Sequence, residues 1–95
     1  MREQKEHGCS MSEYRNGINQ GMNDVESGHG YSDLSRPSLS IDFKCGYLLG
    51  FGYKQIQICG YQHAAEKTLA LANQYPELQQ RFAHELSKLG FQPRH

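Results

Sequence analysis

The feature that most constrains this chain is a spacing of one aromatic residue and two glycines that occurs twice. The two sets are Tyr14, Gly17 and Gly21, and then Phe43, Gly46 and Gly50. On a helix, residues three and four apart lie on one face, so each set forms a stripe. Glycine inside a helix costs about 1 kcal/mol relative to alanine, and close approach of another helix is the simplest compensation.

The two stripes are therefore interpreted as helix-packing surfaces or as a groove for a partner. The residues assigned to this role are Tyr14, Gly17, Gly21, Phe43, Gly46, Gly50 and Tyr53. The alternative is that the glycines mark turns and that both segments are loops. Small residues four apart are best known from membrane helices, but the apolar run 45–53 is far shorter than the ~20 residues of a span.

Length and charge favour one small domain without a basic face. The chain has 95 residues, with ten acidic and ten basic side chains and no tryptophan. This balance argues against a surface dominated by nucleic-acid binding and against an acidic tail. The first ten residues, MREQKEHGCS, lack the apolar core of a signal peptide. Three cysteines, an odd number, fit reduced thiols in a cytoplasmic protein better than a disulfide framework.

Periodicity predicts the first helix and the connection after it. Residues 1–9 are expected to be disordered, and the single helical domain is expected at 10–91, with a tail at 92–95. Ser10 and Glu13 have the spacing of a capping box, which predicts a helix over 11–26. A glycine- and serine-rich linker follows at 27–40, from which Tyr31 and Leu34 are expected to fold back on the helices.

The second helix is expected over 41–58 and is the natural centre of the core, because its first half is apolar around most of its circumference. Ser38 or Ser40 caps it, and Asp42 places a negative charge in its first turn. Its last part alternates apolar and polar residues and could be read as a short strand. A helix is preferred, because no second strand candidate exists to pair with it.

Two further helices complete the prediction. The alanine- and leucine-rich segment 62–75 has strong helix propensity. Pro76 then opens the fourth helix, and Gly90 ends it in a Schellman motif with Phe91. The fold class expected is all-α, a bundle of about four helices in which a glycine-notched pair precedes a helical hairpin.

The run D-F-K-C-G-Y-L-L-G-F, residues 42–51, resembles the D-Y-K-x-G-F-x-L-G-Y run of the YghW-like proteins. These are small enterobacterial proteins without an assigned activity. The upstream aromatic-xx-Gly-xxx-Gly segment resembles the N-terminal segment of that family. The resemblance implies kinship of fold and no chemistry.

A weaker likeness is to ribosome modulation factor, a small bacterial protein that binds ribosomes. The residues that would match its motifs are Gly17, Gly21, Tyr31, Gly46, Gly50 and Phe51. That family is strongly basic and has tryptophans in its second motif, whereas this chain is neutral and has none. The likeness implies a ribosome- or RNA-associated stress factor as an alternative function. Cations and rings that could serve such binding are Lys44, Lys54 and Lys67 with Tyr47, Tyr53 and Tyr61.

Metal binding and catalysis are less favoured. His7, Cys9, Cys45, Cys59 and His63 could supply ligands, but no C-x-x-C is present and the order fits no zinc module. The same thiols and His29 yield cysteine–histidine pairs only of the kind expected by chance. No catalytic residues, no metal ligands and no cofactor are therefore assigned. The function expected is a small non-enzymatic protein-binding or regulatory module, whose partner is another protein or itself, with a metal-binding protein as second alternative.

Overall fold

A computed structural model shows an all-α chain, and the fold class predicted from the sequence is confirmed. The structure describes residues 9–28 and 33–91, and the side chains of 9–11 are left aside. Over these residues the elements are α1 (Cys9–Ser27), α2 (Ile41–Cys59), α3 (Tyr61–Asn73), the 3₁₀ turn η1 (Pro76–Leu78) and α4 (Gln79–Leu89). No strand occurs in the described ranges, so the strand reading of the end of α2 is wrong.

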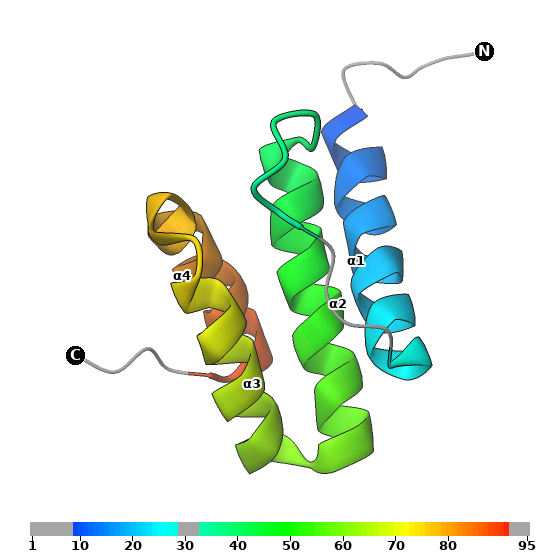
Figure 1. Cartoon of the computed structure of the whole chain (residues 1–95), viewed down its shortest axis with the longest axis vertical. Helices are drawn as coiled ribbons and strands as arrows, with labels where there is room; N and C mark the ends of the chain where they lie inside the picture. The colour runs from blue at the N-terminus through cyan, green and yellow to red at the C-terminus, as the bar shows by residue number, and fades with distance from the viewer. Residues whose placement is uncertain (1–8, 29–32, 92–95) are drawn as a thin grey trace.

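Helix α2 stands in the centre, with α1 on one side and α3 and α4 on the other (Figure 1). Helices α1 and α2 are parallel: Gly17 lies against Phe43 and Tyr47, and Gly21 lies against Tyr47 and Phe51. A parallel pair requires a connection that returns along the full length of the helix. Residues 33–40, the described part of that connection, cross in front of α2 (Figure 1).

The helix ends follow ordinary capping chemistry. Ser40 caps α2, because its hydroxyl accepts a hydrogen bond of 3.1 Å from the amide of Phe43. Gly60, at φ 87°, separates α2 from α3 in a conformation that L side chains rarely adopt. At the end of α4 the amides of Gly90 and Phe91 donate to the carbonyls of Ser87 and Leu86, which is the predicted Schellman motif.

Two local predictions are wrong. Helix α1 begins at Cys9, so Ser10 lies inside the helix and is not its N-cap. The carboxylate of Glu13, the other half of the expected capping box, accepts a hydrogen bond from the Ser40 hydroxyl instead. Pro76 opens a 3₁₀ turn, and the α-helix proper begins after it, at Gln79.

The hydrophobic core lies around α2 and is contributed by every element after α1. Its largest fully buried side chains are Tyr47, Phe51, Phe82, Phe91, Leu34, Leu48 and Leu71. Leu34 folds back into this core as predicted, and its amide donates to the hydroxyl of Tyr75 at 3.2 Å. Tyr31, which carries the same prediction, lies outside the described residues.

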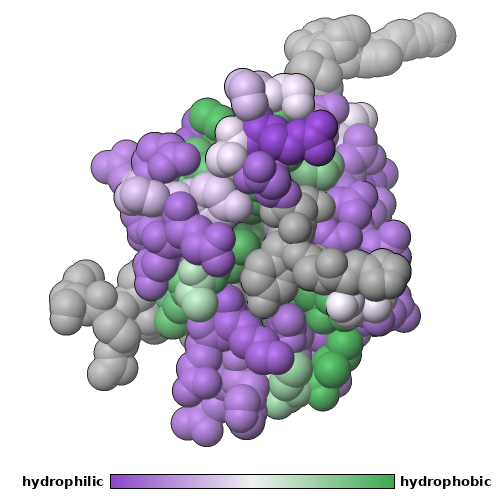
Figure 2. All heavy atoms as spheres, in the orientation of Figure 1, coloured by the Kyte–Doolittle hydropathy of each residue, from purple (hydrophilic) through white to green (hydrophobic). Residues whose placement is uncertain are grey.

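The face that carries the connection is mostly hydrophilic, with hydrophobic residues showing between polar ones (Figure 2). In the described ranges the large apolar side chains that remain exposed are Ile41, Tyr53, Ile58 and Tyr61. Within those ranges no helix is long and apolar enough to cross a lipid bilayer.

Candidate functional site

The four glycines of the two stripes lie between α1 and α2, where the backbones of the two helices touch. A Cβ built on Gly17 would stand 2.1 Å from the carbonyl oxygen of Phe43, and one on Gly46 would stand 2.1 Å from that of Tyr14. Real Cβ atoms do not approach so closely. We call this contact the glycine seam; it consists of Gly17, Gly21, Gly46 and Gly50.

Each glycine of the seam aims an α-hydrogen at a carbonyl oxygen of the facing helix. The direction in which a Cβ would meet oxygen is the direction in which glycine carries hydrogen, so the geometry is that of a Cα–H···O contact. Such contacts contribute about 0.5–1 kcal/mol each, which is comparable to the helix propensity that glycine gives up. The two glycine stripes pack against each other, so the groove predicted for a partner is already occupied by a helix of the same chain.

Tyr53, assigned with the glycines from the sequence, lies apart from the seam. It is 51% exposed, whereas Tyr14 and Phe43 are partly buried against the core. The rings considered for RNA binding also differ in their exposure to solvent. Tyr47 is fully buried and donates a 2.6 Å hydrogen bond to Asp24, so its ring offers no face to a nucleobase.

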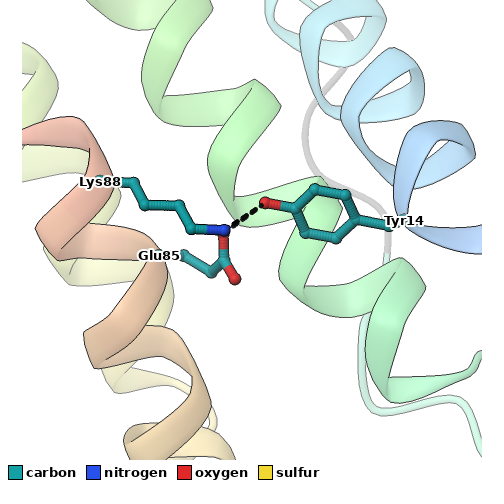
Figure 3. A network of polar contacts seen from close by, with 3 residues as sticks. All are labelled: Tyr14, Glu85 and Lys88. Carbon is teal, nitrogen blue, oxygen red and sulfur yellow. Dashed lines mark hydrogen bonds and ion pairs between the residues drawn. The ribbon is translucent and has the colours of Figure 1, made fainter. Parts of the chain in front are cut away.

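A polar network links the first and last helices across α2 (Figure 3). The Tyr14 hydroxyl donates to the Glu85 carboxylate at 2.7 Å, and the Lys88 ammonium donates to the Tyr14 oxygen at 3.2 Å. Lys88 also stands 3.6 Å from the Glu85 carboxylate and 5.2 Å from the Tyr14 ring centre. Glu85 is only 5% exposed, so these partners satisfy a charge that would be costly to bury alone.

The network shifts the pKa of two of its members upward. Burial, followed by the hydrogen bond to Glu85, raises the pKa of Tyr14. The hydrogen bond to Tyr14 is the main cause that raises the pKa of Lys88. Both groups therefore stay protonated in the folded chain, and the network acts as a fixed brace between α1 and α4.

Beyond this brace, the same side of α1 and α2 presents apolar side chains that stay partly exposed. Ile18 and Met22 follow Tyr14 at successive helical turns, and Leu49 and Tyr53 follow Cys45 in the same way. Tyr14 bonds to α4, and Cys45 lies within the electrostatic reach of Glu85. The row on α1 and the row on α2 therefore both start next to α4 and continue beyond it. We call Ile18, Met22, Leu49 and Tyr53 the open face.

The open face differs from the surrounding surface in how it is packed. Ile18, Met22 and Leu49 are partly exposed and do not belong to the set of partly buried residues that pack against the core. Tyr53 is half exposed. The glycine seam joins α1 to α2, and the Tyr14 brace joins α1 to α4. These two contacts hold the helices that carry the open face in place.

The thiols considered for chemistry lie in unreactive or polar surroundings. Burial raises the pKa of the Cys45 thiol to about 11, so it is protonated at neutral pH. Cys59 donates to the amide oxygen of Gln55 at 3.0 Å, and not to a base. It lines a pocket of about 360 Å³ at the ends of α1 and α2. In the part of the chain that the structure describes, no three His, Cys, Asp or Glu side chains are grouped to hold a metal ion. His7 and the side chain of Cys9 lie outside that description.

Sequence reasoning identified the seam residues but missed the brace and most of the open face. Glu85 and Lys88 are three residues apart on one helix, which is a readable signal, but their partner Tyr14 is distant in the chain. Ile18 and Met22 lie four residues apart on one side of α1, and this spacing alone does not distinguish a covered side chain from a partly exposed one.

Comparison of the chain with protein-family models, with curated proteins and with solved structures gave no match.

Proposed function

We propose that this chain is a non-enzymatic protein-binding module and that the open face is its contact surface. The observation that carries the proposal is the group of apolar side chains on α1 and α2 that stay partly exposed beside the seam. Rigid apolar groups with an aromatic residue among them are typical of the anchor region of an interface.

The surroundings of the open face support this role. The glycine seam leaves α1 and α2 no freedom to move apart without losing their backbone contacts. A preformed surface loses less conformational entropy on binding than a flexible one. Met22 contributes an adaptable side chain, which suits a contact surface.

The proposal includes a cytoplasmic, reducing setting and no catalytic chemistry. Burial keeps the Cys45 thiol protonated at neutral pH, and the Cys59 thiol donates a hydrogen bond to the amide oxygen of Gln55. An odd number of cysteines, three in this chain, suits a reducing compartment.

The test is quantitative capture of partners from the host by the tagged chain, with Tyr53→Ser compared with Ile58→Ser. Both side chains are more than half exposed on α2, but Ile58 lies away from the open face, so it is the matched control. We expect Tyr53→Ser to reduce recovery of a specific partner at least tenfold and Ile58→Ser to leave it unchanged.

Two results would contradict the proposal. Equal recovery by both variants would place the contact elsewhere. Recovery confined to ribosomal proteins and lost after RNase treatment would favour ribosome association instead, the function that the likeness to ribosome modulation factor implies. Thermal unfolding of both variants serves as the check that each is folded.

A further inference from the structure

The pocket of about 360 Å³ opens where α1 and α2 end and α3 begins, at the lower end of the bundle in Figure 1. Its volume lies at the small end of the range of ligand sites, about 300–1,000 Å³. Of the described residues that line the pocket, none belongs to the open face. The pocket is therefore a second candidate site, separate from the proposed contact surface.

Two opposite charges from different helices line this pocket. Asp24 comes from α1 and Lys67 from α3. Hydrogen bonds of 2.6 Å from the Tyr47 hydroxyl and 2.8 Å from the Gln20 amide hold the Asp24 carboxylate in place. Within the described ranges no ion pair joins the Lys67 ammonium to an acidic side chain. The pocket therefore presents a carboxylate on one helix and an ammonium on another.

A buried amide, that of Gln55, lines the same pocket. The residue is only 6% exposed, and its side-chain oxygen accepts a hydrogen bond of 3.0 Å from the Cys59 thiol. Among the described residues its amide nitrogen has no hydrogen-bond partner. A buried donor without a partner is costly, so an acceptor atom of a ligand in the pocket would supply a missing bond.

The pocket also has an apolar wall. Val25, from α1, is partly buried against the core, and Ile58, from α2, is 57% exposed. Aliphatic side chains of this kind favour contact with an aliphatic part of a ligand, because the contact removes apolar surface of both from water.

We propose that the pocket binds a small zwitterion with an aliphatic body, which is the chemistry of a free aliphatic amino acid. The ligand ammonium lies toward Asp24, and the ligand carboxylate lies toward Lys67 and the amide nitrogen of Gln55. The aliphatic part lies against Val25 and Ile58. Asp24 repels a ligand with a negative charge alone, and Lys67 repels one with a positive charge alone, so a ligand with both charges is preferred.

The experiment is an NMR titration of the isotope-labelled full chain with three probes that share one branched aliphatic body. Leucine carries both charges, isocaproate only the carboxylate and isoamylamine only the ammonium. We expect leucine to shift the amide signals of Gln55, Cys59 and Lys67, and to bind at least tenfold more tightly than either of the other probes.

A charge-removing variant and a thiol reaction locate the site. Lys67→Gln, on an exposed side chain, should weaken leucine binding at least tenfold, and Lys44→Gln, on a lysine of α2 that does not line the pocket, should leave it unchanged. Bound leucine should slow the alkylation of Cys59 by iodoacetamide, measured by mass spectrometry of the peptide that contains it.

Three results would overturn the inference. Leucine that leaves the pocket amides unshifted shows that the pocket does not take this ligand. Equal affinity for leucine and isocaproate shows that the ammonium is not recognised. Equal leucine binding by Lys67→Gln and the wild type places the ligand elsewhere. The proposed function is tested separately by Tyr53→Ser, because Tyr53 does not line the pocket.

Discussion

The two sides of α2 are held by opposite means. Toward α1, the four glycines carry no side chain, and backbone meets backbone at the glycine seam. Toward α3 and α4, large side chains such as Phe82 and Phe91 fill the space and are fully buried. Gly52, on this second side, illustrates the contrast: a Cβ there would meet the tips of Leu89, Thr68 and Phe91 and not a main chain.

The difference teaches where the molecule can adjust. A side-chain tip can change rotamer to admit an added methyl group, whereas a helix backbone can only move as a whole. Substitutions that add side-chain atoms should therefore disrupt the seam. Substitutions that remove side-chain atoms should disrupt the packing of α2 against α3 and α4. Substitutions on each side of α2 test this contrast.

Gly46→Leu should have the largest effect. Its Cβ alone would overlap the carbonyl oxygen of Tyr14 at 2.1 Å, so α1 must separate from α2. We expect a loss of about 4 kcal/mol or more in the free energy of unfolding, at the upper end for overpacking. Urea denaturation measures the loss, and hydrogen exchange should show the amides of α1 unprotected. A loss below about 1 kcal/mol would mean that the seam is not closely packed.

Phe82→Ala should break the other side of α2. The ring is 0% exposed and meets Tyr75 edge-on at 6.4 Å between centroids. Removing it leaves a cavity and should cost about 3 kcal/mol. The amides of α1 should keep their protection relative to global unfolding, because the seam is untouched. Preferential exposure of α1 in this variant would contradict the separation of the two sides.

Tyr14→Phe should act on the brace between α1 and α4. It removes the hydroxyl that donates to the buried Glu85 carboxylate while it keeps the ring. We expect a loss of about 1–2 kcal/mol, because a buried charge loses one of its partners. Urea denaturation at pH 7 is the measurement, with Tyr53→Phe, on an exposed tyrosine, as control. Equal effects of the two variants would show that the brace does not stabilise the fold.

High pH should destabilise the chain through the same region. The folded pKa of Cys45 is raised from 9.0 to about 11, and that of Tyr14 is raised above 10.0. A raised folded pKa gives stability below the unfolded value that is lost as pH rises toward the folded one. The urea midpoint should therefore fall between pH 9 and 11, and less steeply in Cys45→Ala. A midpoint that does not fall in the wild type would refute the assignment.

Gly52→Ala should have the smallest effect. The new methyl group meets a terminal carbon of Leu89 at 2.6 Å, which can move aside, and alanine improves helix propensity by about 1 kcal/mol. The net change in the free energy of unfolding should lie within about 1 kcal/mol of zero. Gly46→Ala, the same substitution on the seam, is its matched counterpart and should be strongly destabilising. Similar values for the two alanine variants would remove the contrast between the sides of α2.

The sequence predicts the helices of this chain well, because their signals are local. Periodicity places α2 and α4, Ser40 caps α2, and Gly90 ends α4 in the expected motif. The error at Ser10 has a physical reason: a hydroxyl and a carboxylate three residues apart fit a capping box, but Glu13 finds a partner in Ser40, far along the chain.

The arrangement of the helices is harder to predict from the sequence. The repeated glycine spacing indicates close approach, but nothing local says that the two stripes belong to each other or that the helices run in parallel. Those facts depend on a connection long enough to return along α2 and on Leu34, which anchors it. The open face is not visible in the sequence at all, since Ile18 and Met22 have the same pattern as residues that become buried.

The most direct test of the glycine seam is a nuclear Overhauser measurement on the isotope-labelled full chain. The parallel seam predicts contacts from the Gly17 α-protons to the Tyr47 amide, from Gly21 to the Phe51 amide, and from Gly46 to the Ile18 amide. All three together fix both the contact and the direction of the helices. Glycine α-protons with contacts only inside their own helix, or pairings in the reverse order, would contradict it.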